Sequence, residues 1–430
     1  MSIDLLYSLF QKYPSVQTDT RELTPGSLFF ALKGDNFNGN QFAKQALDAG
    51  AAAAIIDDPA YHIDDRTIVV DNVLTALQAL AKKHREQFSI PFLAITGSNG
   101  KTTSKELVHA VLSTTFKTYT TQGNLNNHIG IPLTLLRVQK DAEMAVIEMG
   151  ANHQKEIAGY CTYALPTHGI ITNCGKAHLE GFGGVEGVKK GKGELFDFIR
   201  KENGTVFINL DLTYLHEMSL GIQSKITFGS LQGETVGNII KADPFLCVSV
   251  LNTAKGALPE LSSIQTQLVG DYNLSNVLLA VSVGIHFGVP PSAIKKALEN
   301  YQPTNSRSQL IKKGNNTIIL DAYNANPSSM QVAIENFSKI QAEKKILMLG
   351  SMAELGDESK KEHEQIIDLI SKYAFQNIVL VGEQFGQLKH PYIQFSTAKE
   401  AAEWYHAQTF ENTHFLIKGS RSMKMEIILA

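Results

Sequence analysis

A short apolar run followed by a glycine-bounded loop constrains this chain more than any other stretch. Phe92 to Ile95 is typical of a buried strand, the loop Gly97-Ser-Asn-Gly100 follows, and Lys101-Thr-Thr103 opens a predicted helix through Leu112. At such a helix start, free backbone N–H groups and the positive end of the helix dipole face an anion. The segment therefore predicts a loop that binds the phosphates of a nucleotide.

The side chains of the loop support this interpretation. Lys101 can reach the β and γ phosphates, and the Thr102 hydroxyl can bind Mg²⁺. One position departs from the usual pattern, because Ile95 stands where a glycine is expected. An ordinary strand-to-helix turn is the alternative. The predicted nucleotide-binding residues are Gly97, Ser98, Asn99, Gly100, Lys101, Thr102 and Thr103.

Length and composition narrow the class of protein. A chain of 430 residues suggests about three domains of roughly 150 residues each. Its net charge of −3 gives no electrostatic indication that the chain binds nucleic acid. The three cysteines show no C-x-x-C spacing, which fits a reduced compartment and no zinc site. There is no basic start typical of a signal peptide and no apolar run near the ~20 residues that span a bilayer. We therefore expect a soluble cytoplasmic enzyme.

The order of apolar runs divides the chain into three units. Residues 1–88 alternate short strands and helices, and Pro91 marks the boundary to a second unit, 89–302. That unit repeats apolar strands with helices between them, which favours a largely parallel sheet. The third unit, 303–430, has a doubly wound, Rossmann-like pattern. We predict an α/β fold of three domains, with the phosphate loop on a central parallel sheet.

The expected strands can be located by residue number. They are 26–32, 52–56 and 67–70 in the first unit, 92–95, 144–149, 169–172, 206–209 and 225–228 in the second, and 317–320, 346–349, 378–381 and 415–417 in the third.

Two polar residues follow strands of the second unit. Glu148 ends one apolar strand, where a carboxylate near a phosphate loop can hold Mg²⁺. His178 follows the next strand. The alternatives are an acid that faces water and a histidine of the surface or core.

Lys192 lies in a lysine-rich, otherwise helical stretch, and by itself it indicates a solvated basic run. However, Gly191 and Gly193 flank it, at a cost of about 1 kcal/mol each relative to alanine. Close approach of the helix backbone to another group would explain that cost.

Further polar residues stand near predicted helix starts and strand ends. Asn273 and Asn276 share one helix face and suit the edge of adenine, although an N-cap at Asn273 is the alternative. Asp321 with Tyr323-Asn-Ala-Asn-Pro327, and Lys418-Gly-Ser-Arg421, follow strands of the third unit, where doubly wound domains bind ligands. Loop solvation and capping are the alternative for both. Asn326 followed by Pro327 also predicts a helix start, because Asn can cap a helix and Pro suits its first position.

Taken together, these pieces resemble the Mur ligases, the ATP-dependent enzymes that form amide bonds in peptidoglycan precursor synthesis. The resemblance covers essentially the whole chain. The strings that carry it are DTR at 19–21, GSLFFALKG at 26–34, TGSNGKTT at 96–103, NLNNHIGIPLTLL at 124–136, EMGAN at 148–152, HLEGFG at 178–183, YNANP at 323–327 and KGSR at 418–421.

The resemblance is strongest to the branch that adds D-alanyl-D-alanine to UDP-N-acetylmuramoyl-tripeptide. The branch that adds the third amino acid would carry an Asp-Asn-Pro-Arg string, which is absent here. Whether the third residue of the peptide is diaminopimelate or lysine stays open. We expect a monomer whose third domain closes over ATP bound on the second. Another amide ligase of the superfamily, of the sibling or cyanophycin type, is the nearest alternative.

Two alternatives come from other classes of protein. A P-loop kinase or a regulatory nucleotide-binding module would form no peptide bond. A dinucleotide-binding oxidoreductase would need a Gly-x-Gly-x-x-Gly turn in the third unit, and none opens a helix there.

The resemblance also implies roles for single residues. ATP and two Mg²⁺ ions are the implied cofactors, and Lys192 stands where the family has a lysine carbamylated with CO₂. The implied catalytic residues are Lys101, His178 and Lys192, and the implied metal site comprises Thr102, Glu148, His178 and Lys192. Nucleotide contacts are implied for Asn273, Asn276, Arg307 and Asp321. Substrate contacts are implied for Asp19, Thr20, Arg21, Asn127, Tyr323, Asn324, Asn326, Lys418 and Arg421, the first three of them with the uridine nucleotide.

Overall fold

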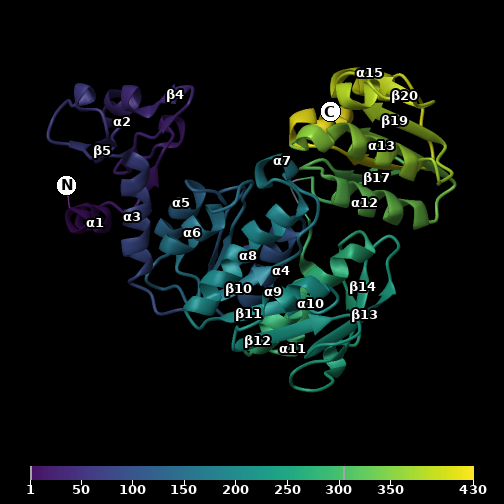
Figure 1. Cartoon of the computed structure of the whole chain (residues 1–430), viewed down its shortest axis with the longest axis horizontal. Coiled ribbons are helices and arrows are strands. Elements are labelled where there is room, and N and C mark those ends of the chain that lie inside the picture. The colour runs from purple at the N-terminus through teal and green to yellow at the C-terminus, as the bar shows by residue number, and fades with distance from the viewer. Residues whose placement is uncertain (1, 304–305) are drawn as a thin grey trace.

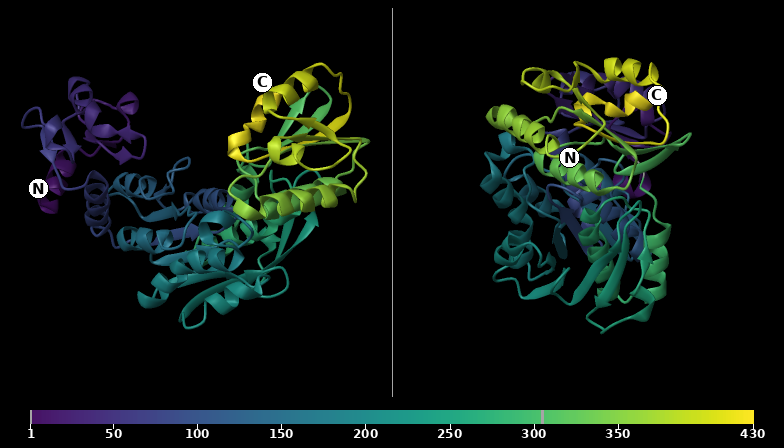
Figure 2. Two further views of the ribbon diagram at one scale, coloured as in Figure 1. Left: turned by 45° about the horizontal axis from the view of Figure 1, so that its top comes forward. Right: turned by 90° about the vertical axis from the view of Figure 1, so that its right-hand side faces the viewer.

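Three larger β-sheets follow one another along the described residues, each accompanied by helices. The computed structural model describes residues 2–303 and 306–430. The first and third domains lie at opposite ends of the larger central domain (Figure 1), which gives the molecule a crescent outline (Figure 2). The predicted three-domain α/β fold is confirmed, while the boundaries at residues 88 and 302 stay predictions.

The first domain is built on a small parallel sheet. Its sheet order is β1-β2-β5-β6. Its elements are α1 (Ile3–Lys12), β1 (Val16–Gln17), β2 (Leu28–Phe30), α2 (Ala43–Asp48), β5 (Ala53–Ile56), β6 (Thr67–Val69) and α3 (Val73–Arg85), with a short hairpin of β3 (Lys33–Gly34) and β4 (Phe37–Asn38).

Helix α3 fixes the first domain to the central one. The His84 ring nitrogen Nε2 lies 2.7 Å from the carbonyl of Val138. The Arg85 guanidinium donates to the carbonyls of Ala164 and Leu165 at 3.0 and 2.8 Å. These side chains leave one domain and satisfy the backbone of the other, so the helix is a shared element.

The central domain contains a nine-stranded sheet in the order β15-β14-β13-β12-β11-β10-β7-β9-β8. Its strands are β7 (Phe92–Thr96), β8 (Thr118–Thr120), β9 (Met144–Glu148), β10 (His168–Ile171), β11 (Thr205–Asn209), β12 (Ser224–Gly229), β13 (Thr235–Lys241), β14 (Cys247–Asn252) and β15 (Ile264–Gln265). Adjacent strands from β8 to β13 are parallel, whereas β13, β14 and β15 are antiparallel. The five expected strands are confirmed.

Four strands of this sheet were not predicted, namely β8, β13, β14 and β15. Strand β8 is only half-buried, β13 carries several exposed residues, and the pairing of β13 with β14 is interrupted by register shifts. A continuous apolar run or a clean alternation is therefore missing from their sequences.

Helices cover both faces of the central sheet. They are α4 (Lys101–Leu112), α5 (Gly130–Leu136), α6 (Glu156–Ala164), α7 (Leu179–Phe182), α8 (Val185–Lys201), α9 (Thr213–Met218), α10 (Leu274–His286) and α11 (Pro291–Asn300). Along β7, Phe92 and Ala94 enter the core beneath α8, while Leu93 and Ile95 enter the core beneath α4 and α10. A strand buried on both faces explains the continuous apolar run before the phosphate loop.

Helix α8 shows why glycines flank Lys192. A Cβ atom on Gly191 would lie 2.4 Å from the Phe182 ring, whereas one on Gly193 would meet only the end of the Met218 side chain, at 3.2 Å. Close backbone approach, expected from the cost of two helical glycines, is thus confirmed at Gly191.

The third domain has a six-stranded sheet in the order β16-β17-β21-β18-β19-β20, parallel except for the edge strand β16. Its elements are β16 (Gln309–Lys313), β17 (Asn316–Asp321), α12 (Pro327–Lys339), β18 (Lys344–Gly350), α13 (Ser359–Ile370), β19 (Asn377–Val381), α14 (Glu383–Gly386), β20 (Ile393–Phe395), α15 (Ala398–His406) and β21 (Thr413–Lys418). The four expected strands are confirmed, and the two not expected are the half-exposed edge strands.

No helix within residues 2–303 and 306–430 combines the length and apolarity that crossing a bilayer requires.

The two glycines of α8 give a matched test of this packing. Gly191→Ala should destabilise the central domain by about 1–3 kcal/mol, because the added methyl group overpacks against Phe182. Gly193→Ala should cost little, since the gain in helix propensity, about 1 kcal/mol, offsets the contact with Met218. Thermal unfolding followed by circular dichroism compares the two, and equal midpoints would contradict the assigned contact.

Candidate active site

The central and third domains face each other across a cleft of about 650 Å³. It lies at the carboxyl ends of parallel strands of both sheets, where doubly wound folds place ligands. The predicted site residues that line it are Ser98, Asn99, Gly100, Lys101, Thr102, Thr103, Asn127, Glu148, His178, Asn273, Asn276, Arg307, Asp321, Tyr323, Asn324, Asn326 and Lys418.

Six predicted residues do not line this cleft. Gly97 and Lys192 are both buried. Asp19, Thr20 and Arg21 belong to the first domain, where the Arg21 guanidinium lowers the pKa of Asp19 to about 2. Arg421 pairs with Glu426 at 2.8 Å on an exposed part of the third domain. The structure therefore separates the predicted uridine contacts and Arg421 from the predicted nucleotide contacts.

The phosphate loop leaves a helix N-terminus facing the cleft. Gly100, the residue before α4, has a φ of +79°. The first N–H groups of any α-helix have no intrahelical partner, and no side chain caps them in α4. Lys101 donates from Nζ to the carbonyl oxygens of Gly97 and Ser98 at 2.7 and 3.2 Å. Burial lowers the pKa of the Lys101 ammonium, and Glu148 opposes that shift. This arrangement can receive phosphate oxygens.

Glu148 is a buried carboxylate surrounded by neutral donors. Its Oε2 accepts from the Thr102 hydroxyl at 2.9 Å, and its Oε1 accepts from the Asn126 amide at 2.7 Å. No ion pair among the described residues includes Glu148, although only 1% of it is exposed. Buried charges in proteins are usually paired or bind a metal. A hydroxyl and a carboxylate beside a phosphate loop therefore fit Mg²⁺.

His178 contacts the third domain. Its Nδ1 lies 2.5 Å from Oε2 of Glu354, in the loop after β18, and this contact lowers the pKa of Glu354. His178 has a φ of +52°, a left-handed conformation that costs an L-residue about 1–2 kcal/mol. Within the described residues, no three His, Cys, Asp or Glu side chains form a cluster that could hold a metal. The histidine is thus paired with Glu354 and does not stand in such a cluster with Glu148.

Lys192 is 1% exposed, so the interpretation of its stretch as a solvated basic run is wrong at this residue. Its Nζ donates to the carbonyl of Ala151 at 2.8 Å and lies 4.7 Å from the centre of the Phe182 ring. Burial lowers the pKa of Lys192 to about 7. Ala151, the residue that accepts this hydrogen bond, lines the cleft.

The side chains of Asn273 and Asn276 are hydrogen-bonded to each other beside the phosphate loop. The Asn276 amide donates to Oδ1 of Asn273 at 2.8 Å, and Asn276 Oδ1 accepts from the Ser104 hydroxyl at 2.9 Å. Asn273 stands at the N-cap position of α10, as the alternative expected, but its side chain makes no capping bond. Its amide donates instead to the carbonyl of Val269 at 2.9 Å.

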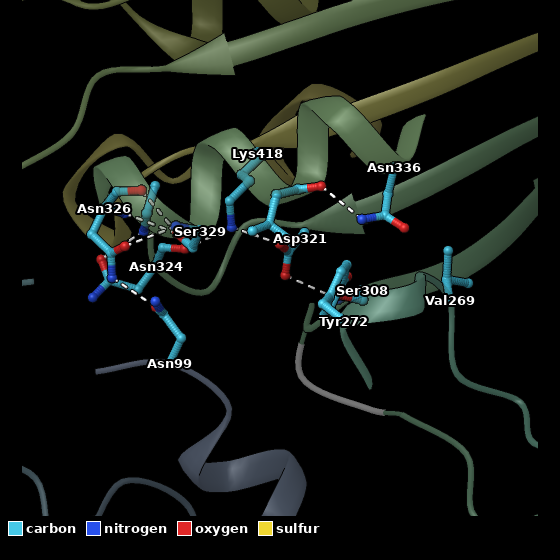
Figure 3. A network of polar contacts seen from close by, with 12 residues as sticks. Asn99, Val269, Tyr272, Ser308, Asp321, Asn324, Asn326, Ser329, Asn336 and Lys418 are labelled. Carbon is cyan, nitrogen blue, oxygen red and sulfur yellow. Dashed lines mark hydrogen bonds and ion pairs between the residues drawn. The ribbon is translucent and has the colours of Figure 1, made fainter. Parts of the chain in front are cut away.

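The third domain contributes a connected set of polar groups (Figure 3). Lys418 Nζ lies 2.6 Å from Oδ2 of Asp321, whose other oxygen accepts from the Ser308 N–H at 3.0 Å. The Arg307 guanidinium stacks 3.5 Å from the centre of the Tyr323 ring. Asp321 and Lys418 end β17 and β21 and Tyr323 follows β17, as the doubly wound pattern predicted, whereas Arg307 and Ser308 precede β16.

One contact joins this set to the phosphate loop. The Asn326 amide donates to Oδ1 of Asn99 at 2.8 Å (Figure 3). Asn326 also caps α12, with Pro327 in the first turn, which confirms the predicted helix start.

Three of the residues that sequence reasoning missed make polar contacts in or beside the cleft. Asn126 directly precedes the predicted Asn127, so the paired asparagines were an available signal. Tyr272, whose hydroxyl lies 2.6 Å from the Ser308 hydroxyl, precedes the predicted Asn273. Glu354 follows β18 by four residues, and only its position beyond a strand end could have indicated it.

Comparison with known proteins agrees with this architecture. Three family models match the chain, namely the Mur ligase family catalytic domain at residues 12–85, the Mur ligase middle domain at 95–284 and the Mur ligase glutamate ligase domain at 306–421. UDP-N-acetylmuramoyl-tripeptide--D-alanyl-D-alanine ligase of Bacillus subtilis is 33% identical over 431 residues, which cover 96% of this chain and 92% of the relative.

Solved structures show the same similarity. A crystal structure of MurF from Acinetobacter baumannii has a TM-score of 0.86 and 30% identity, covering 98% of this chain and 96% of its own. MurF ligase from Thermotoga maritima, solved in complex with ADP, has a TM-score of 0.84 and 26% identity, covering 96% of both chains. Similarity of this extent in sequence and fold confirms the resemblance stated above: the chain belongs to the Mur ligase family.

Proposed function

We propose that this chain is an ATP-dependent ligase that joins D-alanyl-D-alanine to UDP-N-acetylmuramoyl-tripeptide in cytoplasmic peptidoglycan precursor synthesis. The observation that carries the proposal is the cleft itself. A phosphate loop and a buried carboxylate on the central domain face Lys418, Asp321 and Arg307 of the third domain. The full-length relative named for this reaction, and the ADP complex of the Thermotoga maritima ligase, support it.

The chemistry requires activation of a carboxylate. In the proposed reaction the terminal carboxylate of the tripeptide attacks the γ phosphorus of ATP, ADP leaves, and an acyl phosphate forms. The free amine of D-alanyl-D-alanine then attacks the acyl carbon, and inorganic phosphate leaves as the amide forms and the amine loses a proton. Transfer between two anions needs neutralised charge and in-line positioning.

Different residues of the chain would bind the phosphates, hold the magnesium ions and exclude water. The N–H groups at the start of α4 and the Lys101 ammonium would bind phosphate oxygens. Thr102 and Glu148 would hold one Mg²⁺, and His178 with carbamylated Lys192 would serve a second. Bound magnesium would supply positive charge against the phosphate oxygens. The third domain would cover the cleft and exclude water, which otherwise hydrolyses an acyl phosphate.

The remaining contacts would position the substrates. Asn273 and Asn276 would meet adenine, and Arg307 and Asp321 would meet the nucleotide from the third domain. In the first domain, Asp19, Thr20 and Arg21 would bind the uridine nucleotide at the far end of the crescent. Peptide contacts are proposed for Asn127, Tyr323, Asn324, Asn326, Lys418 and Arg421.

The direct test is phosphate release. Purified protein with ATP, Mg²⁺ and UDP-N-acetylmuramoyl-tripeptide should release phosphate in proportion to added D-alanyl-D-alanine, and mass spectrometry should find the pentapeptide product. Single D-alanine in place of the dipeptide is the control for a sibling ligase. Phosphate release that does not depend on the amine acceptor would favour a kinase or a regulatory nucleotide-binding protein. If the protein consumed no ATP with both substrates present, the proposal would be refuted.

A second prediction concerns Lys192. Its burial favours the neutral amine, which is the form that reacts with CO₂. Lys192→Ala should lower kcat by about 100-fold or more, and added acetate or formate should restore part of the activity by replacing the lost carboxylate. Lys190→Ala, an exposed neighbour in the same lysine run, is the control and should stay within about twofold of the parent protein. Full activity of Lys192→Ala would rule out the carbamate.

A further inference from the structure

We propose that Tyr272 of the central domain is a positioning residue for Arg307 of the third domain. Its hydroxyl group binds Ser308, the residue directly after Arg307, and thereby fixes the place of the guanidinium in the cleft. The inference deepens the proposed function, because it gives the segment that carries Asn273 a part in placing Arg307. It rests on that function only for its consequence in nucleotide binding.

The contact crosses the boundary between the two domains (Figure 3). The Tyr272 hydroxyl lies 2.6 Å from the Ser308 hydroxyl, and both residues line the cleft. Burial raises the pKa of the Tyr272 hydroxyl, and the charge of Asp321 raises it further. The tyrosine therefore stays a neutral phenol, which can donate one hydrogen bond to Ser308 or accept one from it.

Ser308 is also bound from within the third domain. Its N–H donates to Oδ1 of Asp321 at 3.0 Å, and the other oxygen of Asp321 lies 2.6 Å from Nζ of Lys418 (Figure 3). The hydroxyl and the N–H of this one serine thus have partners on different domains. Because both groups are engaged, the backbone beside Arg307 is fixed when the third domain is docked.

The backbone on both sides of Arg307 adopts a conformation that L-residues rarely take. Ser306 and Ser308 have φ angles of +54° and +47°, and neither is glycine. The Tyr323 N–H donates to the Ser306 carbonyl at 3.3 Å, and the Tyr323 ring stacks on the guanidinium. Strained residues persist only where surrounding contacts hold them, and they concentrate at functional sites. The Tyr272 hydroxyl supplies one of these contacts from the opposite domain.

Other contacts dock the third domain near this boundary without the tyrosine hydroxyl. The Asp271 N–H donates to Oδ1 of Asn336 on α12 at 2.9 Å, and the Asp271 carboxylate pairs with Lys339 at 3.0 Å. Removal of the Tyr272 hydroxyl should therefore release the segment around Arg307 while the domains stay docked.

The test follows the Arg307 guanidinium in the full-length protein by nuclear magnetic resonance. The ring current of Tyr323 shifts the Hε signal of the stacked guanidinium upfield, so the ¹H–¹⁵N signal of Arg307 Nε reports the stack. Arg307→Lys identifies this signal by its loss, and Tyr323→Leu gives its unstacked position. Tyr272→Phe and Ser308→Ala each remove one hydroxyl of the contact. The control, Tyr119→Phe, removes a tyrosine hydroxyl that is hydrogen-bonded on the edge strand β8.

The Arg307 signal should lie upfield in the parent protein and in Tyr119→Phe. In Tyr272→Phe and Ser308→Ala it should move toward its position in Tyr323→Leu, with an X-ray scattering profile unchanged from that of the parent. An unmoved signal in Tyr272→Phe or Ser308→Ala would overturn the proposal, as would an equal shift in Tyr119→Phe. A parent signal that Tyr323→Leu leaves in place, or a scattering profile of an undocked domain in Tyr272→Phe, would also overturn it.

Nucleotide binding gives the functional consequence. Tyr272→Phe should raise the Kd of a non-hydrolysable ATP analogue, measured by calorimetry, about 3- to 10-fold and leave kcat at saturating ATP within about twofold. In an Arg307→Met background the same substitution should change that Kd by less than about twofold, because the tyrosine acts through the arginine. An equal effect in both backgrounds would overturn the proposal. Should the parent protein form no peptide product, the proposed ligase function fails while the Arg307 signal still decides this inference.

Discussion

The hydrogen bond between Thr102 and Glu148 is the contact on which the rest of the site depends. Strands β7 and β9 are adjacent and parallel, with Ile95 opposite Glu148, so the phosphate loop and the carboxylate emerge together at one edge of the sheet. Glu148 is buried among neutral donors, and α4 begins without a side-chain cap. A buried carboxylate without an ion pair among the described residues and a helix N-terminus without a side-chain cap are complementary to a metal–phosphate ligand.

The second constraint is the docking of the third domain onto this edge. Asn326 caps its own helix through Oδ1 and meets the phosphate-loop residue Asn99 through its amide, so one side chain links local helix formation to the domain interface. On the opposite wall, buried Lys418 pairs with half-buried Asp321. The first domain, by contrast, is tied to the central domain through α3, at the end opposite the third domain (Figure 1).

Much of the fold and part of the candidate site could be predicted from the sequence, because the patterns that indicate them lie within a few consecutive residues. A strand buried on both faces, a glycine loop and a capped proline helix start each occupy a few consecutive residues, and their positions were correct at Phe92, Gly100 and Asn326. Edge strands such as β16 and β20 were not predicted, because half-exposed strands lack a continuous apolar pattern. The lysine run by itself did not predict the burial of Lys192, which only the flanking glycines and the family resemblance suggested. The pairing of His178 with Glu354 was not predicted, because it depends on a contact between distant segments that residue type and spacing do not encode.

The central claim is that Glu148 recruits a divalent cation to phosphates held by the loop, and calorimetric titration with ADP tests it most directly. Titrations of the parent protein and Glu148→Gln, each with and without Mg²⁺, distinguish the contribution of the metal to the affinity for ADP from that of the nucleotide alone. Mg²⁺ should tighten ADP binding to the parent protein by about tenfold or more. In Glu148→Gln the Mg²⁺ effect should vanish, while metal-free binding should not weaken, because the substitution removes a negative charge near the phosphates. An equal gain from Mg²⁺ in both proteins would contradict the account.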